Sequence, residues 1–411
     1  ALDIIVPREG EHPLLELARA LAADKNADLT KIDGLLLRRG DEIVSTPAGT
    51  PVGDLDSLAH PSDYYSFNHV AMSRGCPGRC TFCGSPNFWP DNQVRFHSAE
   101  WMLQEIRSLV NRGITHLFFS DDTFTMDPDR VIELCRGIID RRLPITWNAI
   151  SRVDHIEEEC LFYMRQAGCI QISYGVESGD ERIRKVLGKP VAEATIIDAF
   201  RQTRAYGILP RAYFIYGSPG ETDGSIQKSI ELMIKLKPLS MVAYMLVLFP
   251  GTYLYDRAVK KGWIDDNIWS DPIEDIPWFE LDSTLDFNRV KGFGDRLRTH
   301  FYRHVSQFAD QIDLIDKKEL YPGHADFLSR LALTFSHGEY ADHPLVDSPM
   351  DTASALFKRA LDYAPDARAF MGFGMLRQKQ KAFDSAADIL KKGLAVFPDH
   401  ADLNVCMGLC M

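Results

Sequence analysis

Between about residues 65 and 250, the chain alternates short apolar runs with longer amphipathic stretches. Short apolar runs bounded by turn residues predict buried strands, and stretches with a helical apolar period predict helices. Six runs fit the strand pattern: 69–73, 116–120, 145–149, 170–174, 211–216 and 241–248. Strands that alternate with helices form parallel sheets, so the pattern predicts an α/β fold, a partial six-stranded (βα)6 barrel.

The helices between these strands have recognisable ends. Asp127 precedes Pro128, a residue favoured at the first helical position, and Gly168 and Gly207 stand where helices should stop. In parallel barrels, the chemistry lies at the C-terminal ends of the strands. We therefore expect a functional site in the segments that follow the strands.

The segments on either side of the barrel region have different patterns. An amphipathic helix from Gly10-Glu11 and the hairpin-like GLLLRRGDEIV predict a short N-terminal α/β remnant, too small for a robust core. The segment after Gly262 is aromatic and acidic, and its Trp263, Trp269 and Trp278 either line a pocket or, as we favour, pack on the barrel. We expect four parts, at residues 1–62, 63–262, 263–335 (helical from about 288) and 336–411.

The all-α C-terminal region repeats itself. LFKRALDYAPD at 356–366 aligns with ILKKGLAVFPD at 389–399, and this helical period resembles tetratricopeptide repeats. Two partial copies do not make a stable solenoid, but stacked helix pairs form surfaces that suit a protein partner. Because the chain starts without Met in an apolar segment and stops within a helical pattern, we expect it to be a fragment of a longer protein.

Composition narrows the class of protein. The 411 residues carry a net charge of −12, from 46 basic and 58 acidic residues, which disfavours nucleic-acid or acidic-membrane partners. No run approaches the ~18 apolar residues of a membrane-spanning helix, and the N-terminus lacks a signal-peptide pattern. Several of the eight cysteines fall in apolar segments, which fits a reducing compartment, and we expect a cytoplasmic protein.

Cys76, Cys80 and Cys83, in the run MSRGCPGRCTFCGSP, directly follow the first predicted strand. Three thiolates at this spacing in a Gly/Pro-containing loop can bind three irons of a [4Fe–4S] cluster and leave the fourth iron open. The alternative is a zinc site or three unrelated thiols. A structural zinc usually takes four protein ligands, and the closest downstream candidate for a fourth is His97.

This spacing, with Phe82 just before the third Cys, resembles the radical S-adenosylmethionine (radical SAM) superfamily. The resemblance implies that the open iron is chelated by the amino and carboxylate groups of S-adenosylmethionine. More narrowly, the chain resembles the branch with an N-terminal cobalamin-binding domain, to whose tail and linker residues 1–62 are similar. The Asp-x-His-x-x-Gly element of many such domains is absent from this sequence. If the chain is a fragment, the cobalamin-binding half has been cut away; if it is complete, cobalamin binding is doubtful.

Two further strand ends carry matching residues. The resemblance assigns the S-adenosylmethionine amino group to Asp121 or Asp122, in FFSDDTFT, although this pair can also cap a helix. Arg152, after the third strand, can fork onto the S-adenosylmethionine carboxylate, or it can pair with Asp154 or Glu157.

The fourth and fifth strands end in GVES and GSPGET. Glu177 and Ser178 match the family's GxES element, whose side chains approach the ribose and the methionine moiety. The loop of Gly217, Pro219 and Gly220 matches the one that packs the adenine by backbone contacts, and the next residue, Glu221, can instead serve as a helix cap.

The resemblance implies a reaction sequence. A flavodoxin- or ferredoxin-type donor reduces the [4Fe–4S] cluster, which cleaves S-adenosylmethionine to methionine and a 5′-deoxyadenosyl radical that takes hydrogen from a small-molecule, lipid or peptide substrate. With cobalamin present, a methyl group can follow. Two alternatives remain. One is a radical methylthiotransferase acting on RNA or a ribosomal protein, of which the acidic charge disfavours the RNA substrate; the other is a non-enzymatic scaffold with a degenerate barrel and partner-binding repeats.

Overall fold

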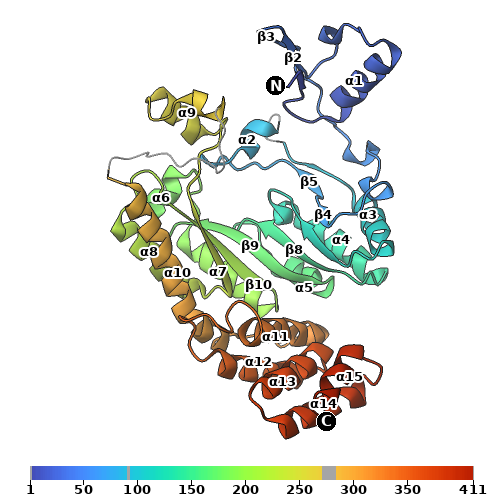
Figure 1. Cartoon of the computed structure of the whole chain (residues 1–411), viewed down its shortest axis with the longest axis vertical. Coiled ribbons are helices and arrows are strands. Elements are labelled where there is room, and N and C mark those ends of the chain that lie inside the picture. Colours follow the sequence, from blue (N-terminus) through green and yellow to red (C-terminus); the bar gives the residue numbers. More distant parts are fainter. Residues whose placement is uncertain (1, 90–92, 271–283, 411) are drawn as a thin grey trace.

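A six-stranded parallel sheet forms the centre of the computed structural model, which describes residues 2–89, 93–270 and 284–410 (Figure 1). The strands lie in the order β11-β10-β9-β8-β7-β4, and every neighbouring pair is parallel. Their bounds are β4 (His69–Val70), β7 (His116–Phe119), β8 (Thr146–Ser151), β9 (Cys169–Glu177), β10 (Leu209–Tyr216) and β11 (Ser240–Met245). Each strand overlaps one predicted run, so the predicted partial (βα)6 barrel is confirmed.

Helices connect these strands and pack on the outer face of the sheet (Figure 1). They are α3 (Ala99–Asn111), α4 (Pro128–Asp140), α5 (Glu158–Gln166), α7 (Glu193–Ala205) and α8 (Asp223–Leu236). Two further helices, α6 (Glu181–Val186) and α9 (Tyr253–Lys260), pack together in a separate apolar cluster, and α9 follows the last strand. The predicted helix ends are confirmed. Asp127 caps α4 by accepting a hydrogen bond from the Arg130 amide, and Gly168 and Gly207 follow α5 and α7 with φ of 93° and 75°.

The core of the barrel lies between the sheet and these helices. Alternate strand residues point outward into it, among them the fully buried Trp147, Tyr174 and Phe214. Burying large aromatic side chains supplies much of the apolar area that stabilises such a layered fold. The sheet therefore gives a rigid frame for the loops at its C-terminal edge.

The N-terminal segment is a small antiparallel sheet with one helix, as predicted. It contains β1 (Ile4–Ile5), α1 (Glu11–Ala23), β2 (Leu36–Arg39) and β3 (Glu42–Ser45). Ion pairs join it to the barrel, because Glu9 contacts both Arg95 and Arg74. Between it and α3 lie β5 (Ser73–Arg74), α2 (Ser85–Phe88) and β6 (Arg95–Phe96), of which β5 and β6 pair antiparallel.

The C-terminal region is helical, as predicted. It consists of α10 (Phe287–Asp310), α11 (Tyr321–Ser336), α12 (Pro349–Tyr363), α13 (Ala367–Lys379), α14 (Phe383–Val396) and α15 (Ala401–Gly408). Helix α10 runs along the sheet edge beside β11, and the others stack beyond it (Figure 1). The two repeated segments end α12 and α14, and each is followed by a second helix; the assignment to tetratricopeptide repeats stays a prediction.

Six short 3₁₀ helices lie among the described residues: Leu29–Lys31, Leu55–Ser57, Pro61–Asp63, Phe124–Met126, Asp266–Ser270 and Lys318–Leu320. Trp269 packs at the edge of the barrel, as favoured, and its indole donates to the Tyr255 hydroxyl at 2.6 Å. Trp263 is 43% exposed, and Trp278 lies outside the described residues. None of the described helices has both the length and the apolar character that crossing a bilayer requires.

Candidate active site

The loop that carries the three cysteines runs from β5 to α2, beyond the C-terminal end of β4. Its backbone is fixed on two sides: the Thr81 amide donates to the Leu187 carbonyl, and the Leu254 amide donates to the Thr81 carbonyl, both at 3.0 Å. Phe82 packs half-buried against the apolar cluster that contains Ile183 and Leu187. The loop is therefore docked on the end of α6 and the start of α9.

The thiols of this loop lie close to one glycine and one arginine. Cys76, Cys80 and Cys83 are half-buried free thiols. A Cβ placed on Gly78 would lie 3.2 Å from Cys76 Sγ, 3.9 Å from Cys80 Sγ and 3.3 Å from Arg152 Nη1. The missing side chain at Gly78 thus leaves room between two sulfur atoms and a guanidinium group.

The spacing of the thiols bears on the choice between zinc and an iron–sulfur cluster. Among the described residues, no three His, Cys, Asp or Glu side chains are placed to hold a metal ion. A single tetrahedral zinc, with Zn–S bonds of about 2.3 Å, would require its sulfur ligands to lie about 4 Å apart. Cysteines that bind a cluster each take a different iron and are spaced more widely. The described side chains thus do not form a ready-made tetrahedral zinc site.

Cations surround these thiols. Burial raises the pKa of Cys80, while the Lys189 ammonium and the Arg152 guanidinium act in the opposite direction. Burial also raises the pKa of Cys83, against a hydrogen bond from the Ser85 backbone. Positive charges next to a thiol favour the thiolate, which is the form that binds metal.

Asp121 braces the start of the cysteine loop. Its carboxylate accepts hydrogen bonds from the Met72 amide at 3.2 Å, the Ser73 amide at 2.6 Å and the Ser73 hydroxyl at 2.5 Å. Burial raises its pKa to about 6 despite these three donors. Asp121 thus ties the end of β7 to β5, and its oxygens are already engaged.

Asp122 lies on the other side of the same loop and is exposed. One of its oxygens accepts hydrogen bonds from Ser85 Oγ at 2.8 Å and from the Trp89 indole at 2.9 Å. Because Asp127 is the residue that caps α4, the pair at 121–122 does not serve as the helix cap considered from the sequence. Of the two carboxylates, Asp122 is the one open to a ligand ammonium.

Arg152 follows β8 and makes the ion pair considered as its alternative role. Its Nε and Nη2 donate to the two carboxylate oxygens of Asp154 at 2.9 and 2.7 Å. The third nitrogen, Nη1, faces Gly78 of the cysteine loop. The ion pair thus fixes the plane of the guanidinium group, while Nη1 remains directed at the cysteine loop.

Glu177 and Ser178, at the end of β9, differ in their environments. Glu177 adopts φ of 63° and accepts a hydrogen bond from Lys189 Nζ at 2.9 Å, and both side chains are more than nine-tenths buried. Ser178 is fully buried; its Oγ lies 3.3 Å from Ser229 Oγ and accepts from the Asp180 amide at 3.1 Å. Ser178 is therefore engaged in fixing the turn, and Glu177 is the member of the pair beside the cysteine loop.

Lys189 lies at the site but was not predicted from the sequence. The only signal was a single Lys in the otherwise apolar run VLGKPV. A Cβ on Gly175 would lie 2.2 Å from Glu177 Oε1 and 2.5 Å from Lys189 Nζ. The absence of a side chain at Gly175 is what permits this buried ion pair.

The turn after β10 holds a buried carboxylate. Gly217 and Gly220 adopt φ of 85° and 75°, and Glu221 Oε2 accepts from the amides of Gly217 at 2.6 Å and Ser218 at 3.3 Å. Thr222, not Glu221, caps α8. In the described structure, Ser218 Oγ and Glu221 Oε1 are buried without a hydrogen-bond partner. The turn that includes Pro219 therefore has unused hydrogen-bonding capacity at the edge of the site.

The inner face of the sheet is open. Ile150 is 42% exposed, whereas its neighbours Ala149 and Ser151 are each 2% exposed. Tyr244 is 53% exposed, and its ring lies 5.7 Å from that of Tyr213 on the adjacent strand. Aromatic and apolar side chains exposed on a concave sheet surface suit the binding of an organic molecule.

Comparison with known proteins agrees with this geometry. Residues 70–233 match the family model described as the Radical SAM superfamily. An uncharacterized methyltransferase of Pyrococcus horikoshii is 30% identical over 280 residues, 65% of this chain and 60% of that protein. The anaerobic magnesium-protoporphyrin IX monomethyl ester cyclase of Cereibacter sphaeroides is 31% identical over 274 residues, 62% of this chain and 44% of that protein. The chain thus spans about half the length of these relatives.

Solved structures share the fold. The cobalamin-dependent S-adenosylmethionine radical enzyme OxsB aligns with a TM-score of 0.58 at 18% identity, covering 99% of this chain and 67% of that one. The radical S-adenosylmethionine methyltransferase TsrM from Kitasatospora setae aligns with a TM-score of 0.55 at 20% identity, covering 63% of this chain and 56% of that one.

Proposed function

We propose that this chain, whose residues 70–233 match the Radical SAM superfamily model, is the catalytic part of a cobalamin-dependent radical SAM enzyme that transfers a methyl group or forms a ring. The observation that carries the proposal is the loop of Cys76, Cys80 and Cys83. It projects from the sheet edge to which the candidate S-adenosylmethionine ligands also belong. Three thiols and nearby cations are a suitable donor set for a [4Fe–4S] cluster with one open iron.

When bound, the cluster and S-adenosylmethionine supply the electron transfer and the carbon-centred radical, and the protein supplies binding, orientation and electrostatics. On this chain, Arg152 Nη1 is available to the S-adenosylmethionine carboxylate, and exposed Asp122 to its ammonium. Glu177, held by Lys189, is available to the ribose hydroxyls. The turn at 217–221, with its unpartnered Ser218 Oγ, is available to the adenine.

The substrate would bind against the open inner face of the sheet. Tyr213, Tyr244 and Ile150 give that face an apolar and aromatic character. Such a surface favours a small organic substrate over a nucleic acid, in line with the net charge of −12. A flavodoxin- or ferredoxin-type protein would deliver the electron.

Cobalamin is proposed from the relatives. OxsB and TsrM are described as cobalamin-bound enzymes, and OxsB aligns with nearly the whole of this chain. Residues 1–62 would then lie at the junction with a cobalamin-binding domain.

The test is the formation of 5′-deoxyadenosine after anaerobic reconstitution with iron and sulfide, using dithionite as reductant. Replacing Cys76, Cys80 or Cys83 by Ala should each reduce this product at least a hundredfold, because each variant loses one iron ligand. Cys410→Ser is the matched control, since that thiol lies in the C-terminal helices, and it should retain full activity. Full turnover in all three loop variants would rule out the assignment.

A further inference from the structure

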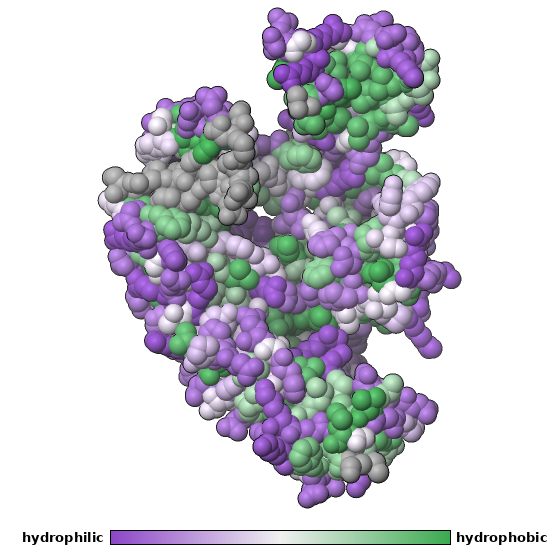
Figure 2. All heavy atoms as spheres, viewed as in Figure 1, coloured by the Kyte–Doolittle hydropathy of each residue, from purple (hydrophilic) through white to green (hydrophobic). Residues whose placement is uncertain are grey.

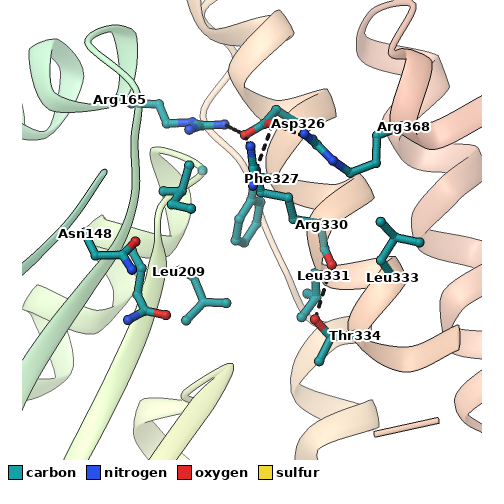
Figure 3. Close-up of a pocket in the computed structure, with 13 residues that line it drawn as sticks. Asn148, Arg165, Leu209, Asp326, Phe327, Arg330, Leu331, Leu333, Thr334 and Arg368 are labelled. Carbon is teal, nitrogen blue, oxygen red and sulfur yellow. Dashed lines mark hydrogen bonds and ion pairs between the residues drawn. The ribbon is translucent and has the colours of Figure 1, made fainter. Parts of the chain in front are cut away.

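A cavity lies at the opposite end of the strands from the cysteine loop. It has a volume of about 330 Å³ and lies between the inner face of the sheet and helix α11 (Figure 3). Its sheet wall is formed at β8 and at the starts of β9 and β10. Apolar side chains supply part of the lining, namely Ile170, Leu209, Phe327, Leu331 and Leu333. This volume is sufficient for a small organic molecule.

Three arginines from three different helices converge on one carboxylate at this cavity. Asp326 of α11 accepts from Arg165 Nη2 at 2.7 Å, from Arg330 Nε at 2.9 Å and from Arg368 Nη1 at 2.6 Å. Figure 3 shows Arg165 and Arg368 reaching Asp326 from opposite sides. All four residues line the cavity.

The charges of this cluster do not balance. Although burial alone would raise the pKa of Asp326, Arg165, Arg330 and Arg368 lower it to about 2, so that it is ionised. One carboxylate then faces three guanidinium groups, which leaves a local excess of two positive charges in a chain whose net charge is −12. Within the described residues, the terminal nitrogens of Arg330 have no hydrogen-bond partner. This group of three arginines around Asp326 therefore has hydrogen-bond donors that no atom of the described residues uses.

Two buried polar atoms around the cavity also lack partners among the described residues: Asn148 Oδ1 and Arg165 Nε. The side chain of Arg165 is only 3% exposed. Its Nε lies 3.7 Å from where a Cβ on Gly207 would be, and Gly207 lines the cavity. Buried polar atoms are normally hydrogen-bonded, so unpartnered atoms beside a cavity point to a ligand or water that completes them.

We propose that this cavity is a binding site for a small molecule that carries an oxyanion, a carboxylate or a phosphate, on an apolar body. The oxyanion binds to the free guanidinium donors of Arg330 and Arg368, whose planar geometry suits two-oxygen recognition. The apolar body lies against Leu209 and Phe327, and the Asn148 amide contacts its polar edge. The site is distinct from the cysteine loop and does not depend on the proposed radical chemistry.

The rival interpretation is that the cluster is only a clamp between the barrel and the helices. A single Arg165–Asp326 pair already joins α5 to α11, and Arg368 extends it to α13. A clamp gives no role to the buried and unpartnered Oδ1 of Asn148. Binding of an anion distinguishes the two interpretations.

The experiment is isothermal titration calorimetry of the full chain, as purified and without added S-adenosylmethionine, with phenyl phosphate as the probe and phenol as its neutral counterpart. We expect saturable binding of phenyl phosphate, with binding of phenol at least tenfold weaker. Arg330→Gln should weaken phenyl phosphate binding at least tenfold, because it removes charged donors while Arg165 and Arg368 still hold Asp326. Arg201→Gln, on an exposed Arg–Asp pair of α7, is the matched control and should not change binding.

Asn148→Asp provides an independent variant of nearly the same shape. It adds a negative charge to the opposite wall and should also weaken phenyl phosphate binding at least tenfold, even if Arg330→Gln fails to fold. No saturable binding up to about 10 mM would overturn the proposal. So would binding that both Arg330→Gln and Asn148→Asp leave unchanged. Since the titration requires neither an iron–sulfur cluster nor a reductant, its failure can be distinguished from failure of the proposed function.

Discussion

At the scale of single residues, two buried carboxylates stand just beyond the ends of strands. Asp121 and Glu221 both accept backbone hydrogen bonds that fix the loops around the site. Burial nevertheless raises the pKa of each, to about 6 and about 7. Such groups fix the local backbone, and because their pKa differs between the folded and unfolded states, they make the free energy of unfolding depend on pH.

Glu221 gives a test of this effect. Its folded pKa of about 7 exceeds the ordinary value of 4.5, so the folded state binds this proton more tightly than the unfolded state. The contribution to stability is therefore present below about pH 4.5 and is lost as the pH rises through 7. Glu221→Gln mimics the protonated form, so its free energy of unfolding relative to the native protein should increase by about 2–3 kcal/mol between pH 5 and pH 8.

Urea denaturation of both proteins at the two pH values measures this difference, in which the titration of all other groups cancels. An equal difference at pH 5 and pH 8 would show that the Glu221 carboxyl is not perturbed.

Some residue roles follow from the sequence and others do not. The cysteine spacing and the cap at Asp127 are local patterns, and the structure confirms the cap. The commitment of Asp121 to Ser73 involves residues 48 positions apart, and no local pattern encodes it. The Lys189–Glu177 pair was not predicted either. It depends on the absence of a side chain at Gly175, and the sequence gives no local sign of this contact.

At the scale of elements, the sheet was predictable because parallel strands are buried on their helix-covered side and form short apolar runs. The predicted run 170–174 nevertheless fell short of β9, which continues to Glu177. The predicted run stopped early because polar residues at the end of β9 break the apolar pattern, although the backbone pairing with β10 persists to Glu177. The short β5–β6 pair was not predicted, since two-residue strands have no periodicity to detect.

The junction between the barrel and the C-terminal helices depends on Asp326. Asp326→Asn leaves Arg165, Arg330 and Arg368 without their shared carboxylate, so the three cations repel one another in a partly buried place. We expect a loss of about 3 kcal/mol in the free energy of unfolding, together with faster amide hydrogen exchange in α11 and α13. Asp310→Asn, at an exposed position on α10, is the control and should change neither quantity.

If Asp326→Asn were as stable as the control, the ion pairs of Asp326 would not hold the barrel and the C-terminal helices together.

The contribution of Asp326 to the free energy of unfolding has a pH dependence of opposite sign to that of Glu221. Because the folded pKa of about 2 lies below the ordinary 3.8, this stabilisation is present above about pH 4 and is lost as the pH falls through 2.

At the scale of the whole molecule, the parts are arranged around the central sheet. The N-terminal segment and the cysteine loop lie toward one end of the sheet, and the C-terminal helices lie at the other (Figure 1). Figure 2 shows apolar residues gathered on the N-terminal segment, where Leu14 and Leu15 of α1 are about half exposed. The proposed radical site and the proposed anion site thus occupy opposite ends of one sheet.

In the proposed function, Cys76, Cys80 and Cys83 hold a [4Fe–4S] cluster with one iron open to S-adenosylmethionine. The most direct measurement is the EPR spectrum of the anaerobically reconstituted and reduced protein, recorded with and without S-adenosylmethionine. We expect a [4Fe–4S]⁺ signal that changes when S-adenosylmethionine is added, because the ligand binds the open iron. A protein that takes up zinc or no metal, or a cluster signal that S-adenosylmethionine leaves unchanged, would contradict it.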